Sequence, residues 1–233
     1  MASSRWFMPD FVLRVGGSVL ASPINPQLIT EYSNVLKRLV SEGFRILVVT
    51  GGGELARKLI EYARSMGMPV DSQDRIAIQA SRVVAQLLAE ALKPVASSEV
   101  PSRIGRLPRL FERFRVVVMG GLRPGMTTDT VAVLAALKLG FPLLIKATDR
   151  DGVYDKDPSI HPDASKIDSM DFDRLMDMFG RVRYKAGLKS IIDPKAARLI
   201  ARHRIRTVVL NGFKPENVEL AVKGRKVGTI IYG

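Results

Sequence analysis

Four short segments of the 233-residue sequence could bind phosphate, because each is rich in glycine or aspartate and each follows an apolar stretch. They are residues 16–18, 51–53, 120–128 and 148–152. Glycine lets the backbone approach a ligand closely, and free N–H groups at the start of a helix attract anions. If the apolar stretches are parallel strands, the four segments meet at one edge of a sheet, which predicts a polyphosphate or nucleotide site.

Two common nucleotide-binding motifs do not account for these segments. The dinucleotide pattern G-x-G-x-x-G is absent after the first apolar stretch. The P-loop pattern is almost met by Gly120, Gly125 and Thr127, but Met126 stands where the phosphate-binding lysine belongs. Without that cation a P-loop ATPase is disfavoured, although a loop of this shape can still hold the less charged phosphate of a monophosphate.

Apolar strands that alternate with helices should position the glycine segments. Strands are predicted at residues 11–15, 45–50, 115–119, 142–147, 206–210 and 229–232, and helices at 26–42, 54–66, 76–92, 129–139 and 194–203. Residues 97–108 and the polar stretch from 149 to 166 are predicted to be loops. Strands that are apolar throughout indicate a mainly parallel sheet covered on both faces, which is an α/β protein of one domain with two lobes.

The composition indicates a reducing compartment and excludes several kinds of site. There is no cysteine, which rules out disulfides, thiol nucleophiles and Cys-ligated zinc. The two histidines, His161 and His203, disfavour a His-rich metal site and are predicted to lie on the surface. No apolar run approaches the roughly 18 residues of a membrane span, and residues 1–10 do not resemble a signal peptide. We therefore expect a cytoplasmic protein without a membrane partner.

The formal net charge of +13 allows two interpretations. One is a surface for nucleic acid or an anionic membrane, and the other is a protein that handles phosphorylated small molecules. Aromatic residues make up only 6% of the chain and the basic residues are scattered, so the sequence shows no stacking platform. We expect no nucleic-acid partner; such a partner would bind in a steeply salt-dependent way.

Several motifs together resemble a known family. They are Val15-Gly16-Gly17-Ser18, Thr50-Gly51-Gly52-Gly53 with Arg57, Gly120-Gly121 with Pro124-Gly125 and Thr127-Thr128-Asp129, and Lys146-Ala147-Thr148 with Asp151-Gly152-Val153-Tyr154 and Asp157-Pro158. In this order they resemble the amino-acid-kinase family, most closely its archaeal uridylate kinase branch. The resemblance covers nearly the whole chain. It implies a three-layer α/β/α sandwich over residues 1–233, with a UMP-side lobe at about 1–140 and an ATP-side lobe at 141–233.

The resemblance implies transfer of the γ-phosphoryl group of ATP to UMP, giving UDP and ADP, in pyrimidine nucleotide biosynthesis. The acceptor phosphate oxygen is already largely ionised at pH 7, so the reaction needs no general base. What remains is in-line positioning of two anions and neutralisation of charge on the transferring group. The resemblance further implies Mg²⁺ carried by the ATP phosphates, with no metal site of the protein's own, and a homohexamer with feedback by UTP.

The site residues implied by the resemblance fall into three groups. Lys146 and Arg14 would neutralise charge on the transferring group, and Asp129 would orient a cation or cap its helix. The ATP-binding residues would be Gly17, Ser18, Gly53, Arg57, Thr148, Tyr154 and Asp157. The UMP-binding residues would be Gly52, Asp74, Leu122, Arg123, Pro124, Gly125, Met126, Thr127 and Thr128, with Asp74 suited to accept from the ribose hydroxyls.

Some of these residues have simpler interpretations, and other activities fit the fold. Asp193 is predicted to cap a helix that begins at Pro194, and Tyr154 could pack in the core. Many family members carry lysine where this chain has Arg14, and arginine differs in shape. An isopentenyl phosphate kinase is disfavoured because residues 54–58 lack the histidine of that branch. A non-catalytic relative that stores molybdate or tungstate would bind ATP without using UMP.

Overall fold

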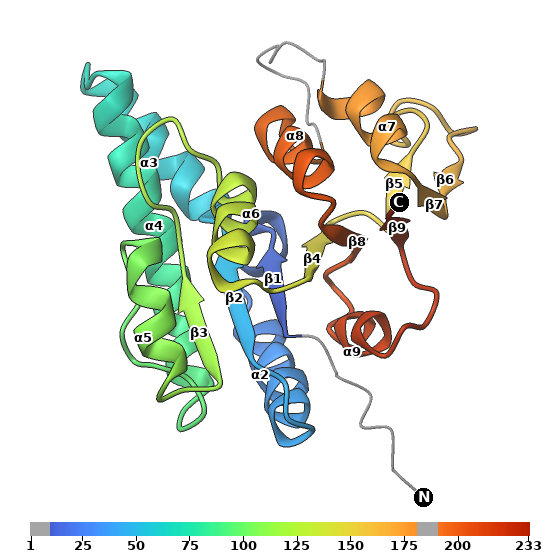
Figure 1. Cartoon of the computed structure of the whole chain (residues 1–233). Coiled ribbons are helices and arrows are strands. Elements are labelled where there is room, and N and C mark those ends of the chain that lie inside the picture. Colours follow the sequence, from blue (N-terminus) through green and yellow to red (C-terminus); the bar gives the residue numbers. More distant parts are fainter. Residues whose placement is uncertain (1–9, 181–190) are drawn as a thin grey trace, which may run out of the picture.

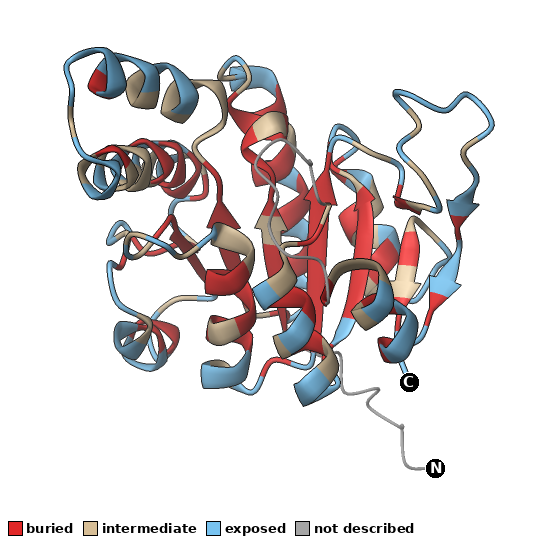
Figure 2. Cartoon of the chain, turned by 90° about the horizontal axis from the view of Figure 1, so that it is seen from above, coloured by how far each residue is buried: buried red, intermediate tan, exposed pale blue. Residues whose placement is uncertain are grey.

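Five parallel strands form the centre of the sheet in the computed structural model, which describes residues 10–180 and 191–233. Their order is β3-β2-β1-β4-β8, and β9 and β7 extend it beyond β8. Only β9 runs antiparallel to its neighbour β8. The strands are β1 (Phe11–Val15), β2 (Ile46–Thr50), β3 (Val116–Met119), β4 (Leu143–Thr148), β7 (Ser169–Met170), β8 (Arg206–Asn211) and β9 (Thr229–Ile231). The predicted mainly parallel sheet is therefore confirmed, and its strands are deeply buried (Figure 2).

Helices cover both faces of the sheet because successive side chains of each strand point to opposite faces. One core joins alternate strand residues to α1 (Gly17–Leu20), α2 (Pro26–Ser41), α4 (Val70–Ala91) and α9 (Glu216–Val222). The other core joins the remaining strand residues to α5 (Leu107–Phe111), α6 (Thr128–Leu139), α7 (Phe172–Leu175) and α8 (Pro194–His203). The result is the predicted three-layer α/β/α sandwich (Figure 1).

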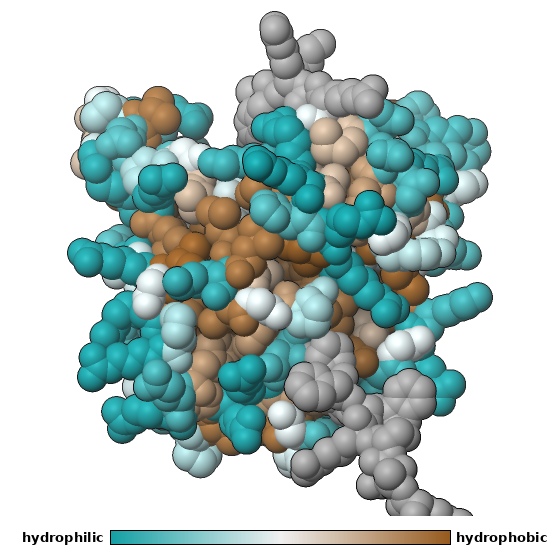
Figure 3. All heavy atoms as spheres, in the orientation of Figure 1, coloured by the Kyte–Doolittle hydropathy of each residue, from teal (hydrophilic) through white to brown (hydrophobic). Residues whose placement is uncertain are grey.

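The outer parts of the molecule lie at the two ends of the sheet. Helix α3 (Gly53–Ser65) packs against α4 at the β3 end, and only Ala63 among its residues is fully buried. A small hairpin of β5 (Val153–Tyr154) and β6 (Lys166–Ile167) lies at the opposite end (Figure 1). Hydrophobic residues form a band across the middle of the face that α6 covers (Figure 3). Within the described residues, no helix is long and apolar enough to cross a membrane.

Local capping fixes where the main helices begin. In α2, Asn25 accepts from the N–H of Leu28 at 3.0 Å, and Pro26 occupies the first helical position. Helix α6 begins after Thr127, whose hydroxyl accepts from the N–H of Thr130 at 3.1 Å. These boundaries match the predicted helix starts to within one residue.

Several sequence-based predictions were wrong in detail. Helix α4 begins at Val70, six residues before the predicted start, because the polar first turns carry no apolar pattern. The predicted loop at 97–108 contains a 3₁₀ turn (Ile104–Arg106) and the start of α5. The predicted loop between residues 149 and 166 contains β5 and the first residue of β6. Helix α9 was not predicted at all. The absence of a signal peptide concerns residues 1–9, which lie outside the described part of the chain.

Candidate functional site

The first two glycine loops touch each other at the carboxyl ends of β1 and β2. A Cβ atom on Gly17 would lie 2.2 Å from the nitrogen of Gly53, so no larger residue fits there. Gly53 itself has φ +57°, and a Cβ atom on it would lie 2.2 Å from the carbonyl oxygen of Ala21. The N–H of Gly16 donates to the carbonyl of Ala147 at 2.8 Å, which ties the first loop to the end of β4. The predicted meeting of these loops at one edge is confirmed.

Ser81 of α4 holds the third glycine loop against the second. Its hydroxyl accepts from the N–H of Gly121 at 2.8 Å, and its carbonyl accepts from the hydroxyl of Thr50 at 3.0 Å. A Cβ atom on Gly120 would lie 2.7 Å from the Ser81 hydroxyl, and one on Gly52 would lie 3.2 Å from the Ser81 nitrogen. The glycines therefore allow α4 to approach the ends of β2 and β3 closely.

Two more side chains of α4 bind the backbone of the third loop. Arg82 donates through Nε to the carbonyl of Gly121 at 3.1 Å and through Nη2 to that of Leu122 at 3.4 Å. Asp74 accepts from the N–H of Gly125 at 2.9 Å. Beside them lies an open cavity of about 370 Å³, within the range of small-molecule sites. Its lining residues are Arg75, Ile76, Ile78, Gln79, Arg82, Leu122, Arg123 and Pro124.

Arg14 and Lys146 are brought side by side by the register of the sheet. Arg14 of β1 lies opposite Lys146 of β4, and both side chains point toward α6. There Asp129 lies between them: its Oδ1 is 2.5 Å from the Lys146 Nζ and 2.7 Å from the Arg14 Nε. Arg14 Nη2 also donates to the hydroxyl of Thr128 at 2.9 Å. We call Arg14, Asp129 and Lys146 the ion cluster.

The ion cluster is shielded from water and carries one excess positive charge. The side chains of Arg14, Asp129 and Lys146 are 16%, 12% and 8% exposed. The Nε of Arg14 makes no hydrogen bond despite its closeness to Asp129, so that contact is an ion pair only. Two buried cations around one carboxylate attract a further anion, because the cluster is not neutral.

The pKa values of the cluster follow from burial and from its charges. The pKa of Lys146 is lowered to about 8, first by burial and then by the charge of Arg14, while Asp129 acts in the opposite direction. Burial alone would raise the pKa of Asp129, but Arg14 and Lys146 together hold it below its usual range. Asp129 is therefore ionised at neutral pH, and Lys146 is a cation whose proton is held weakly enough to be lost in mild alkali.

The structure decides between the two interpretations of Asp129. The cap of α6 is Thr127, and Asp129 lies in the first turn with its carboxylate on the two cations. The capping role was therefore wrong. The carboxylate instead contacts Lys146 and Arg14, and its role in orienting these cations during catalysis stays a prediction. Asp193, in contrast, caps α8 as predicted, because its Oδ1 accepts from the N–H groups of Lys195 and Ala196, each at 2.9 Å.

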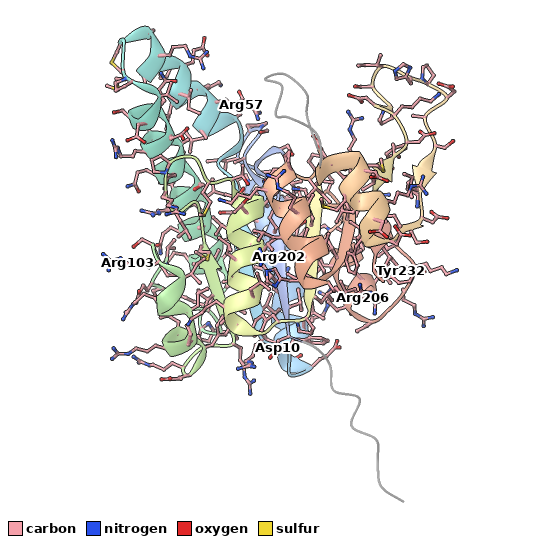
Figure 4. The ribbon with its side chains drawn as sticks, turned by 45° about the horizontal axis from the view of Figure 1, so that its top comes forward. Asp10, Arg57, Arg103, Arg202, Arg206 and Tyr232 are labelled. Carbon is pink, nitrogen blue, oxygen red and sulfur yellow. The ribbon has the colours of Figure 1, made fainter. Side chains whose placement is uncertain are left out.

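The remaining predicted ATP-side residues contact other partners. Arg57 is exposed and donates to the hydroxyl of Ser22 at 3.0 Å; it lies at the end of the molecule opposite Asp10 (Figure 4). Thr148 is buried and donates to Asp149 at 3.1 Å. Tyr154 is half-buried in β5, and Asp157 is exposed in the loop after it, 3.4 Å from Arg150. Arg57 follows the second glycine loop and Thr148 ends β4, whereas Tyr154 and Asp157 belong to the segment of the β5–β6 hairpin at the far end of the sheet.

Sequence reasoning missed Ser22, Ser81 and Arg82. The hydroxyl of Ser22 accepts from the N–H of Glu54 at 3.0 Å and so fixes the start of α3. No local pattern marks these three residues, because each acts on a segment far away in the sequence. The paired glycines at 120–121 were the one available signal, since they imply that another element approaches closely.

The described residues hold no group of three or more His, Cys, Asp or Glu side chains that could bind a metal ion. The Asp129 oxygen that faces the site is already in contact with both cations of the cluster. Phosphate oxygens are among the ligands that Mg²⁺ accepts in nucleotide sites.

Comparison with known proteins places this chain among kinases. Residues 11–211 match the model of the amino acid kinase family. The chain is 42% identical over 220 residues to the uridylate kinase of Methanocella arvoryzae, which covers 94% of this chain and 98% of that protein. The crystal structure of the uridylate kinase from Archaeoglobus fulgidus matches with a TM-score of 0.87 and 39% identity, over 95% of this chain and 99% of that one. The UMP kinase of Bacillus anthracis shares the fold at a TM-score of 0.79 and 20% identity, over 96% of each chain.

Proposed function

The chain belongs to the amino acid kinase family, and on that premise we propose that it transfers the γ-phosphoryl group of ATP to UMP, giving UDP and ADP. It is a nucleoside monophosphate kinase. The observation that carries the proposal is the ion cluster of Arg14, Asp129 and Lys146 at the edge where the glycine loops meet. The identity of about 40% to uridylate kinases over nearly the whole chain supports UMP as the acceptor.

The reaction needs positioning and charge neutralisation more than acid–base chemistry. A phosphate oxygen of UMP attacks the γ-phosphorus of ATP, the bond to the β–γ bridging oxygen breaks, and ADP leaves with that electron pair. Lys146 and Arg14 neutralise charge on the transferring group, and Asp129 holds them in place. No proton has to move, because the acceptor oxygen is already ionised.

The two substrates occupy different parts of the edge. We assign the ATP phosphates to the backbone of the first two glycine loops and the outer ATP contacts to Arg57, Thr148, Tyr154 and Asp157. We assign UMP to the third loop and the cavity beside α4, where Asp74 would accept from the ribose. In this arrangement the residues before about 140 form the UMP-side lobe and the later residues form the ATP-side lobe. The phosphates of both substrates then meet over the ion cluster.

Mg²⁺ would enter with ATP. Bound together with the phosphates of ATP, it would neutralise part of their charge. The protein's own contribution is the set of backbone N–H groups and the two cations of the ion cluster. The same proposal includes a homohexamer with feedback by UTP and a role in pyrimidine nucleotide biosynthesis, which rest on the likeness to uridylate kinases. It also includes a cytoplasmic location without a nucleic-acid or membrane partner, which rests on the composition of the chain.

A nucleotide panel tests the proposal. ADP release should be measured with ATP and Mg²⁺ in the presence of UMP, CMP, AMP or isopentenyl phosphate. We expect fast release with UMP and much slower release with the other acceptors. Lys146→Met is the matched control and should abolish the reaction while leaving the fold intact by circular dichroism. Preference for isopentenyl phosphate, or ATP binding without any UMP-dependent turnover, would replace this proposal with another activity of the fold.

A further inference from the structure

One carboxylate, that of Asp193, lies between the starts of two helices. Its Oδ1 accepts from the first N–H groups of its own helix, α8. Its Oδ2 accepts from the hydroxyl of Thr127 at 2.6 Å, and the hydroxyl of Thr130 lies 3.3 and 3.4 Å from the two oxygens. Thr127 and Thr130 belong to the start of α6. Asp193 therefore connects α8 of the ATP-side lobe with α6 of the UMP-side lobe.

Capping alone does not require this second set of contacts. A helix cap needs one side-chain oxygen that accepts from the first turn, and serine serves as well as aspartate. Asp171 shows the simple case in this chain, because it caps α7 by accepting from the N–H of Arg174 at 2.8 Å. Asp193 uses both oxygens, and the second one reaches the capping residue of another helix.

The residue that Asp193 holds is the one that sets the geometry of the ion cluster. Thr127 is the cap of α6, and the next two residues, Thr128 and Asp129, contact Arg14 and Lys146. The N–H of Asp193 also contributes to keeping the pKa of Asp129 low, which shows that the two residues are close. A shift of the Thr127 hydroxyl would therefore move the carboxylate that orients both cations.

We propose that Asp193 is a positioning residue for phosphoryl transfer: it fixes the start of α6 against α8 and so holds Thr128 and the ion cluster where the acceptor phosphate binds. The inference rests on the proposed function, because it concerns the same site. It adds a residue that touches neither substrate in this account and that joins the two lobes through hydroxyl groups.

Asp193→Ser separates capping from positioning, because serine keeps the cap and is too short to reach α6. We expect kcat/KM for UMP to fall about 10- to 100-fold, since misplacement of a reacting group by about 1 Å can cost up to 10² in rate. The KM for ATP should stay within about twofold of the wild type. Asp171→Ser is the matched control and should leave both parameters unchanged. Equal activity of the two variants would reduce Asp193 to a cap and overturn the proposal.

Thr130→Val provides a second test, because Thr130 is buried and valine has a similar shape. Adding Thr130→Val to Asp193→Ser should lower kcat/KM for UMP little further, because both changes remove the connection between Asp193 and the start of α6. If the fold-losses in kcat/KM of the two single variants multiplied in the double variant, the two changes would be independent and a shared connection would be contradicted.

Amide hydrogen exchange of residues 127–136 gives a readout that does not depend on turnover. Asp193→Ser should speed exchange in the first turn of α6 at least tenfold relative to Asp171→Ser. If the wild type lacked UMP-dependent activity, the proposed function would be wrong. The amide exchange rates of residues 127–136 would still show whether Asp193 fixes the start of α6.

Discussion

Asparagine in place of Asp129 should move the alkaline limit of the reaction to lower pH. Lys146 has a pKa of about 8, lowered by burial and by Arg14, and Asp129 keeps it from falling further. Among the described residues, Asp193 also raises it, with a smaller effect than Asp129. As the pH rises through 8, wild-type Lys146 loses its proton. The kcat/KM for UMP should therefore fall above that pH, about tenfold per unit.

The size of the shift follows from the distance within the ion cluster. The Asp129 oxygen and the Lys146 nitrogen are 2.5 Å apart. Even with the dielectric constant of water, ~80, this pair of unit charges is worth ~1.7 kcal/mol, or ~1.2 pKa units. Because the pair is buried, the true value is larger. Asp129→Asn should therefore lower the pKa of Lys146, and with it the alkaline limit, by at least about one pH unit.

The assay is kcat/KM for UMP between pH 7 and 10, because this ratio reports the pKa values of the free enzyme. Phosphate groups with a second pKa near 6 are about 90% ionised at pH 7 and almost completely ionised from pH 8, so they do not contribute to the alkaline limit. Asp168→Asn is the control, since it removes the same charge from an ion pair that is 88% exposed on the Asp168 side. An unchanged alkaline limit in Asp129→Asn, measured on a protein whose circular dichroism matches the wild type, would refute the reasoning.

Three other substitutions probe the loops. Thr128→Val should raise the KM for UMP severalfold more than the KM for ATP, because Thr128 lies at the end of the third loop; equal effects in steady-state kinetics would mean that the two sides are exchanged. Gly17→Ala should lower kcat/KM for ATP at least tenfold, because its methyl group would collide with Gly53, whereas Gly105→Ala enters open space and should be silent. Arg82→Gln should weaken UMP binding about tenfold in calorimetry with ATP binding unchanged, and weakened ATP binding would contradict this.

The parts of the site that could be predicted from sequence are those fixed by single strands and the turns after them. Strands such as 11–15 and 115–119 are apolar at every position except Arg14 and Arg115, so their ends and their common direction followed from the pattern alone. Because the strands are parallel, the loops after them were predicted to meet at one edge of the sheet. Short elements could not be predicted in this way, because they contain too few buried residues to form a pattern. Strands β5 and β6 have two residues each, and α9 has seven residues with only two of them buried.

Contacts between distant segments were the part that sequence could not give. Thr127, Thr128 and Asp129 are all residue types that cap helices, so the local sequence cannot decide which of them caps α6, and only Asp129 was considered for that role. That Thr127 caps, and that Asp129 is thereby turned toward Arg14 and Lys146, depends on how α6 packs on the sheet. Arg82 likewise belongs to the site only because α4 crosses the end of β3.

The pairing of Arg14 with Lys146 in neighbouring strands has a consequence for how the sequence can change over generations. The register of β1 and β4 fixes the distance between Arg14 and Lys146, so the two side chains stay neighbours whatever residues occupy these positions. A mutation that neutralised Asp129 would leave two like charges trapped under α6, and a later change at either basic position would then restore the balance. The charges at these three positions should accordingly change together across descendants of this gene, or not at all.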